Sequence, residues 1–149
     1  MTIVVDASVA LKWVLHEPAS EIADRLLDEE LMAPSLWLVE AGNALWRRAT
    51  RGELTAQEAQ ERLSELFNAP VATVPLEADV VAATRLAGEL GHPVYDCLYL
   101  ALALREDTYV VTADRRFTAA LSKHPKLSRA VCLRSEEHTS ELQSRQCIS

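Results

Sequence analysis

The sequence predicts an α/β protein in which a parallel sheet of four to five short strands carries helices on both faces. Short β-branched and apolar runs alternate with helical segments along the chain, which is typical of such a sheet. Residues 94–105 form a helical segment that is apolar nearly all round, so we expect this helix to be buried. Acidic residues follow two of the expected strands, and sites form at the carboxyl ends of strands in open parallel sheets.

Several of the expected helices begin or end at a recognisable signal. The strands are expected over residues 3–5, 31–33, 71–76, 109–112 and 130–133. The helices are expected over residues 7–16, 18–28, 34–51, 55–68, 77–90 and 94–105. Thr55 and Glu58 form a capping box at one helix start, and Gly52 and Gly91 stand where two helices end. Right-handed connections place the carboxyl ends of the first and fourth strands at one edge of the sheet.

Four acidic residues occupy positions that are otherwise apolar or lie at strand ends. Asp6 follows the first strand and Asp114 follows the fourth, while Glu40 and Asp96 interrupt the apolar starts of two helices. An ionised carboxylate that is buried alone is costly, and the remedies are protonation, a hydrogen-bonded counter-ion or a metal. Carboxylates in one pocket repel one another, and a divalent cation removes this repulsion most simply. A site made of oxygen atoms suits Mg²⁺ or Mn²⁺ better than Zn²⁺.

Two of these acids also have purely structural interpretations, which the sequence leaves open. Asp6 stands where a helix N-cap is expected, and Glu40 has Arg47 as an alternative partner on its own helix. His92 precedes the helix that carries Asp96. We interpret His92 as a loop residue, because no second histidine stands at metal-ligand spacing and the expected site is otherwise all oxygen.

Length and composition favour one intracellular domain. The 149 residues are 49% hydrophobic, which is ample for a single core. The three cysteines form neither a spaced framework nor a CxxC pair, which argues against a disulfide scaffold and a zinc site. The longest apolar run, residues 97–104, is too short to cross a membrane, and Asp6 and Lys12 interrupt any signal-peptide pattern at the start. We therefore expect a cytoplasmic protein with no membrane segment.

The formal net charge of -7 argues against a broadly basic surface for nucleic acid. Nucleic-acid binding would depend on bound cations and on a local basic patch. Candidate basic residues end the helix of Glu40 or follow Asp114, and they are Arg47, Arg48, Arg51, Arg115, Arg116, Lys123, Lys126 and Arg129. A solvated helix face explains any single one of them equally well.

Four separated motifs stand in the chain, in the order VVDAS, PSLWLVEAGNAL, HPVYDCLYLALA and VVTADRRF. Together they resemble the motifs of PIN-domain ribonucleases, particularly VapC-type toxins of bacterial toxin–antitoxin pairs, over about residues 2–133. The resemblance implies a PIN-like three-layer fold with the sheet in the middle. It also implies an acidic quartet, which consists of Asp6, Glu40, Asp96 and Asp114. Thr112 then matches the hydroxyl that orients the quartet, and Asn43 matches a polar position common in the family.

The same resemblance implies an activity. It predicts a Mg²⁺- or Mn²⁺-dependent endoribonuclease that hydrolyses RNA phosphodiester bonds and leaves 5′-phosphate and 3′-hydroxyl ends. Asp6 and Asp96 are the expected principal metal ligands, and Asp114 is a further direct or water-mediated ligand. Glu40 is expected to hold a second metal or to position the attacking water.

The resemblance also implies partners, namely an RNA substrate, a second copy in a homodimer and a cognate antitoxin. The tail of such an antitoxin lies in a groove near the acids. Helices expected over residues 18–28 and 55–68 are candidate walls of this groove. Trp13, Trp37 and Trp46 lie nearby in sequence, and each is more readily explained as a core residue.

Two other classes of protein compete with this interpretation. A haloacid-dehalogenase domain also places an aspartate after its first strand, but it needs a second acid two residues later, where Ser8 stands. A receiver domain needs paired acids and a late lysine after a strand, which the sequence lacks. A catalytically silent PIN-like module that binds RNA or protein is the remaining alternative, although all four acids are present.

Residues 134–149 lose the hydrophobic patterning of the rest of the chain. The segment from Arg134 to Ser144 resembles the translation of a common sequencing adapter. We therefore predict a nuclease domain over residues 1–133 and a non-native tail over residues 134–149.

Overall fold

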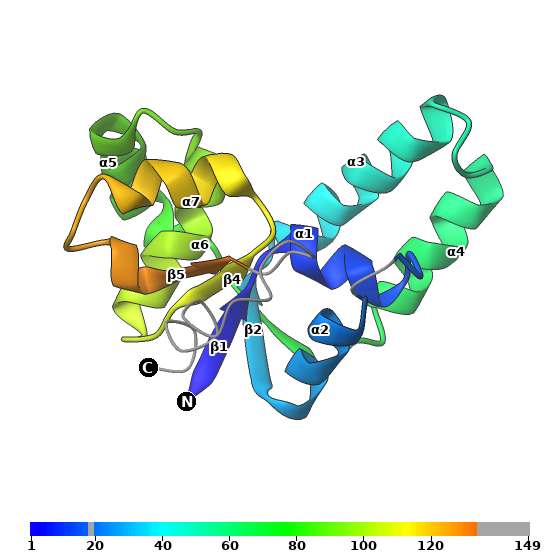
Figure 1. The fold of residues 1–149 in the computed structure, drawn as a ribbon, viewed down its shortest axis with the longest axis horizontal. Coiled ribbons are helices and arrows are strands. Elements are labelled where there is room, and N and C mark those ends of the chain that lie inside the picture. Colours follow the sequence, from blue (N-terminus) through cyan, green and yellow to red (C-terminus); the bar gives the residue numbers. More distant parts are fainter. Residues whose placement is uncertain (18–19, 134–149) are drawn as a thin grey trace.

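The computed structural model describes residues 1–17 and 20–133, and a five-stranded parallel sheet forms its centre (Figure 1). The strand order is β3-β2-β1-β4-β5, with every neighbouring pair parallel. The strands are β1 (Thr2–Val5), β2 (Glu30–Pro34), β3 (Val71–Val74), β4 (Val110–Thr112) and β5 (Val131–Leu133). The predicted fold class is confirmed, whereas the predicted tail over residues 134–149 lies outside the described residues.

Strand β1 lies in the middle of the sheet, between β2 and β4. Ile3 pairs with Leu31 on one side, and Val5 pairs with Val111 on the other. Val5 and Val111 have no exposed surface, as expected for central parallel strands whose two faces are covered. The carboxyl ends of β1 and β4 are therefore neighbours, so the residues that directly follow these strands meet.

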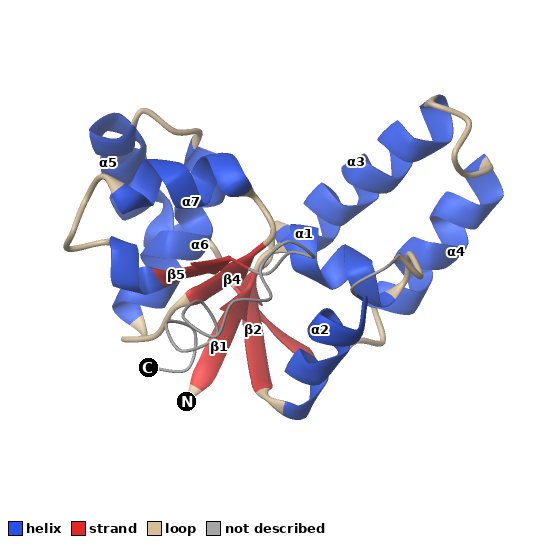
Figure 2. Ribbon diagram, in the orientation of Figure 1, coloured by secondary structure: helices blue, strands red, loops and turns tan. Residues whose placement is uncertain are grey.

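Helices cover both faces of this sheet (Figure 2). One group consists of α1 (Ala7–Ala10), α2 (Ser20–Arg25), α3 (Trp37–Thr50) and α4 (Ala56–Leu66). The other group consists of α5 (Val80–Leu90), α6 (Val94–Arg105) and α7 (Arg115–Ser122). Short 3₁₀ turns add the segments Leu11–Trp13, Leu26–Asp28, Glu77–Asp79 and Ser128–Ala130. In the described part of the chain, every helix is too short or too polar to traverse a lipid bilayer.

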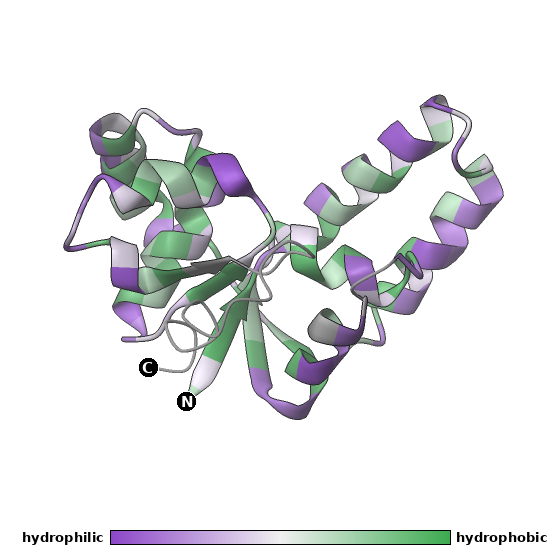
Figure 3. Ribbon diagram, in the orientation of Figure 1, coloured by the Kyte–Doolittle hydropathy of each residue, from purple (hydrophilic) through white to green (hydrophobic). Residues whose placement is uncertain are grey.

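Helix α6 connects the two hydrophobic clusters of the fold. Tyr99 and Leu102 pack into the cluster that holds the central strands, and Leu98 and Leu100 pack into the cluster with α5 and α7. The hydropathy colouring agrees with this, since α6 and the central strands are mostly hydrophobic while the α3–α4 arm carries hydrophilic turns (Figure 3). Because α6 is packed on both sides, the position of Asp96 in its first turn is well defined.

Most of the predicted helices are shorter in the structure, and α1 and α3 show why. Helix α1 ends at Ala10 and continues only as a 3₁₀ turn, and His16 then adopts a φ of 37°, which a right-handed helix does not accommodate. Helix α3 begins at Trp37, because Pro34 still belongs to β2 and pairs with Val74 of β3. The bounds predicted for α6 are confirmed, as is the capping box that starts α4.

Helix α7 is absent from the sequence prediction. It has eight residues, and its buried side chains are Phe117 and Leu121. A helix this short has little stability of its own and depends on tertiary packing, so its own sequence pattern is weak. The cap that starts it is Asp114, which the sequence indicated only as a site residue.

The three tryptophans differ in their surroundings. Trp37 is buried in the core, as predicted. Trp13 is half-buried, and its indole N–H donates a hydrogen bond to the carbonyl oxygen of Ala23 at 2.8 Å. The expectation that Trp46 is a core residue is wrong, because 60% of its surface is exposed on the outer side of α3.

Candidate active site

Asp6 lies directly after β1 with only 6% of its surface exposed. Its backbone N–H donates to the carbonyl oxygen of Val111 at 3.0 Å, which extends the pairing of β1 with β4 by one residue. The Asp6 side chain makes no capping hydrogen bond to α1. Its Oδ2 instead accepts hydrogen bonds from Thr112 Oγ1 at 2.7 Å and from Ser8 Oγ at 2.8 Å. The interpretation of Asp6 as a side-chain N-cap is therefore wrong.

Thr112 and Ser8 bind Asp6 through the same pattern of hydrogen bonds. Thr112 is fully buried at the end of β4, and its Oγ1 also accepts the backbone N–H of Asp114 at 3.0 Å. Ser8 Oγ accepts the backbone N–H of Ala113 at 3.0 Å. Each hydroxyl thus accepts a hydrogen bond from a backbone N–H of the β4–α7 connection and donates one to Asp6, which fixes the carboxylate orientation. Ser8 is a site residue that sequence reasoning missed, although a hydroxyl two residues after a strand-end acid was a usable signal.

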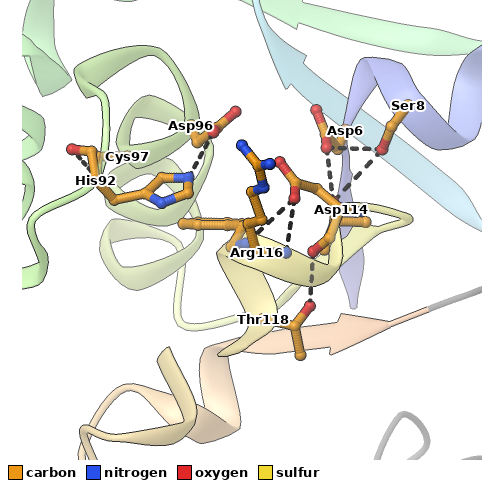
Figure 4. Close-up of polar contacts among 10 residues, drawn as sticks. Asp6, Ser8, His92, Asp96, Cys97, Asp114, Arg116 and Thr118 are labelled. Carbon is orange, nitrogen blue, oxygen red and sulfur yellow. Dashed lines mark hydrogen bonds and ion pairs between the residues drawn. The ribbon is translucent and has the colours of Figure 1, made fainter. Parts of the chain in front are cut away.

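Asp114 caps helix α7 and also belongs to the acidic cluster. Its Oδ1 accepts the backbone N–H groups of Arg116 at 2.9 Å and Phe117 at 3.2 Å, which caps α7. Its backbone carbonyl oxygen accepts the hydroxyl of Thr118 at 3.0 Å. The Asp114 carboxylate is therefore held in a fixed orientation beside Asp6, as Figure 4 shows.

Asp96 projects from the first turn of α6 and is paired with His92. The distance between His92 Nε2 and Asp96 Oδ2 is 2.6 Å. One possible ligand atom each of His92, Asp96 and Asp114 lies within 4.8 Å of the other two, so these three side chains form a group that could hold a metal ion. In Figure 4 Asp96, Asp114 and Asp6 face a common space from α6, from the start of α7 and from the end of β1.

Glu40 faces the same acids from α3. Its Oε1 is buried, and it has no hydrogen-bond partner in the described structure. Burial is the main reason that its pKa is raised to about 7, the Tyr99 hydroxyl acts in the opposite direction, and Asp6 and Asp96 raise the pKa further. Among the described residues Glu40 forms no ion pair, so the alternative pairing with Arg47 is not found.

The aspartates also influence one another. Burial raises the pKa of Asp6 to about 6, the hydrogen bonds from Thr112 and Ser8 oppose this rise, and the charges of Asp96 and Asp114 add to it. The pKa of Asp96 is raised by burial, lowered by the His92 hydrogen bond and raised by Asp114. The four acids of the predicted quartet are thus gathered at one edge of the sheet, where the negative charges of neighbouring acids disfavour those of Asp6, Glu40 and Asp96.

The basic residues near the site are not equivalent. Arg115 and Arg116 are exposed in the first turn of α7, directly after Asp114. Arg48 forms ion pairs with Glu17 and Glu53, so it is engaged within the protein. The predicted polar position Asn43 is exposed on α3, one turn after Glu40.

Residues 3–121 match the PIN domain family. The chain belongs to the PIN-domain family. Within it, VapC-type proteins are similar to this chain. Ribonuclease VapC3 of Pyrobaculum aerophilum is 38% identical over 120 residues, covering 78% of this chain and 92% of the relative. Ribonuclease VapC1 of Mycobacterium tuberculosis is 34% identical over 121 residues, covering 78% and 89%.

Solved structures of similar proteins agree with the fold. The crystal structure of PAE2754 from Pyrobaculum aerophilum superimposes with a TM-score of 0.65 at 26% identity, covering all of this chain and 91% of that one. Mycobacterium tuberculosis VapC20, described as a toxin that cleaves the sarcin-ricin loop, gives a TM-score of 0.60 at 20% identity, covering 79% and 94%. The predicted membership among VapC-type PIN domains is confirmed by these likenesses together.

Proposed function

We propose that this PIN-domain protein is the toxin of a toxin–antitoxin pair and that it hydrolyses RNA with the help of a bound Mg²⁺ or Mn²⁺. The observation that carries the proposal is the convergence of Asp6, Glu40, Asp96 and Asp114 from four separate segments. A fold gains no stability from gathering like charges in a partly buried pocket, so the cluster requires a functional reason.

The residues of the cluster fit a divalent cation. Glu40 Oε1 is buried without a hydrogen-bond partner among the described residues, and burial and the neighbouring acids raise the pKa values of Asp6 and Glu40 toward neutrality, so the negative charges of these two acids are disfavoured. Asp6 and Asp96 would be the principal ligands, with Asp114 as a third. Carboxylate oxygens favour Mg²⁺ or Mn²⁺. When bound, such an ion lowers the pKa of water and stabilises the charge that develops on a phosphate group.

The side chains of the protein supply orientation and proton transfer. Thr112 and Ser8 keep the Asp6 carboxylate in one orientation, and the α7 cap does the same for Asp114. Glu40 has a pKa of about 7, which suits a group that positions the attacking water and accepts its proton near neutral pH.

The partners follow from the VapC relatives and from the surface beside the site. RNA would contact Arg115 and Arg116, which are exposed next to Asp114. A cognate antitoxin would cover the acids, and a homodimer is the assembly we expect of a VapC-type protein. We expect these encounters to take place in the cytoplasm.

The decisive experiment is a ribonuclease assay with and without a chelator. The purified protein should cleave RNA in Mg²⁺ or Mn²⁺, lose the activity in EDTA, and regain it when the metal is restored in excess. The Asp96→Asn variant should be inactive under all three conditions, because it removes a principal ligand. RNA binding without cleavage in any metal would instead support the catalytically silent module.

A further inference from the structure

Each of the three aspartates has one carboxylate oxygen occupied by protein donors. Asp6 uses Oδ2 for two hydroxyl groups, and Asp114 uses Oδ1 for two backbone N–H groups. Asp96 uses Oδ2 for His92 Nε2. The described residues donate no hydrogen bond to the other oxygen of these three carboxylates. Each aspartate therefore offers a cation one oxygen that no protein donor contacts.

The donors to Asp6 and Asp114 are redundant, whereas Asp96 depends on one side chain. Asp6 and Asp114 each accept two hydrogen bonds, so losing one donor leaves the other. For Asp96 the described structure offers only His92. The orientation of the Asp96 carboxylate is therefore most sensitive to a change in this histidine.

The imidazole ring of His92 is firmly placed. Its side chain is only 11% exposed, and its ring lies 5.1 Å from the ring of Phe117, measured between centroids. The backbone N–H of His92 donates to the carbonyl oxygen of Ala87 at 3.3 Å, and its carbonyl oxygen accepts the Cys97 thiol at 3.9 Å. Figure 4 shows the ring directed at the Asp96 carboxylate from the side away from Asp6.

We propose that His92 is a positioning residue that confines Asp96 to binding a cation through one oxygen, so that the site selects small octahedral ions over Ca²⁺. The inference rests on the proposed metal site and adds a residue to it. Mg²⁺ and Mn²⁺ are held by single oxygens at near-octahedral positions, whereas Ca²⁺ takes six to eight oxygens and readily accepts a carboxylate through both. Without the His92 hydrogen bond, Asp96 can rotate and offer both oxygens, which removes the disadvantage of Ca²⁺.

The test compares Mn²⁺ and Ca²⁺ binding to the full chain by calorimetric titration, with melting temperature as a second readout. His92→Leu removes the donor and keeps an apolar group against Phe117, whereas His92→Gln keeps an N–H donor. His124→Leu is the matched control, because this half-buried histidine lies beyond α7. We expect His92→Leu to lose about tenfold to a hundredfold in Mn²⁺ affinity, as for other partners of metal ligands, while Ca²⁺ binding is kept or strengthened.

His92→Gln should retain most of the preference for Mn²⁺, and His124→Leu should behave as the wild type. An unchanged Mn²⁺-to-Ca²⁺ ratio in His92→Leu would overturn the inference and leave the metal site intact. A parallel titration with Zn²⁺ tests whether His92 is itself a ligand. If His92→Gln lost as much Mn²⁺ and Zn²⁺ affinity as His92→Leu, the imidazole would be a metal ligand and the inference would be overturned. If the wild type bound neither Mn²⁺ nor Ca²⁺, the proposed function would fail together with this inference.

Discussion

At the scale of single residues, the site consists of acidic side chains that are shielded from solvent and repel one another. Asp6, Glu40 and Asp96 all have raised pKa values, and burial is the largest cause in each case. Hydrogen bonds from Thr112, Ser8 and His92 oppose the rise without cancelling it. This arrangement costs stability in the free protein and favours a cation.

Asp96→Asn should therefore stabilise the metal-free protein. The substitution removes a repelling charge, and the amide oxygen can still accept the His92 hydrogen bond. A gain of about 1 kcal/mol would raise the melting temperature by a few degrees in a domain of this size. The measurement is thermal unfolding in EDTA, with Asp107→Asn as control, because Asp107 is exposed and its φ of 53° suits asparagine equally well.

Added metal should make the wild type melt at a higher temperature than Asp96→Asn. Mn²⁺ at a hundredfold excess over its dissociation constant should stabilise the wild type by about 2.7 kcal/mol and Asp96→Asn much less. If Asp96→Asn melts below the wild type in EDTA, or keeps the full response to metal, Asp96 is a structural hydrogen-bonding group instead of a ligand.

At the scale of elements, α7 connects the acids to the expected RNA surface. Asp114 caps this helix, and its first two residues are Arg115 and Arg116. The backbone of the first turn therefore fixes the carboxylate, while two arginine side chains emerge at the surface beside it. Positive charge is thus supplied locally on a chain whose net charge is -7.

Reversing the charge of Arg115 and Arg116 should weaken RNA binding and flatten its dependence on salt. Each phosphate contact contributes to the slope of the logarithm of affinity against the logarithm of salt concentration, by about 0.7 for single strands. The measurement is fluorescence anisotropy with a short labelled RNA, in an Asp96→Asn background that does not cleave it. Arg25→Glu, on the exposed side of α2, is the control. An unchanged slope in the double Arg115 and Arg116 variant would place the RNA surface elsewhere.

At the scale of the whole molecule, the buried acids couple folding to pH. The folded-state pKa of Asp6 is about 6 and that of Glu40 is about 7, compared with ordinary values of 3.8 and 4.5. At pH values between the ordinary and the folded-state pKa values, the folded protein binds more protons than the unfolded chain. Its stability therefore falls as pH rises through this range. The stabilising contribution is fully present below about pH 4 and is lost as pH rises through the folded-state pKa values.

The metal-free protein should accordingly melt at a higher temperature at pH 5 than at pH 7.5. Glu40→Gln should reduce this difference, because the amide does not titrate, whereas Glu29→Gln changes an exposed carboxylate and should have no effect. Thermal unfolding in EDTA at a series of pH values provides the measurement. A wild-type melting temperature that rises steadily from pH 5 to pH 7.5 would show that the two acids are not held as the structure places them.

The sequence alone determined the features that depend on local patterns. Alternating strands and helices identified the parallel α/β fold, and apolar residues all round the segment 94–105 identified α6 with the observed bounds. The four acids could be identified because a charged residue in an apolar segment or at a strand end can be recognised without knowing its tertiary contacts. The family resemblance then connected them, and the fold brings Asp6, Asp96 and Asp114 to a common space, with Glu40 close enough to feel the charges of Asp6 and Asp96.

Only the tertiary structure decided which groups hold those acids. Ser8 reaches Thr112 and Ala113 across more than a hundred residues of sequence, and no local pattern specifies such a contact. His92 is a loop residue, as predicted, but its hydrogen bond to Asp96 was not predicted, because the orientation of that carboxylate depends on how α6 packs. Helix α7 likewise exists through its packing and its cap. Periodicity records which side of an element is buried, whereas hydrogen-bond partners depend on how distant elements meet.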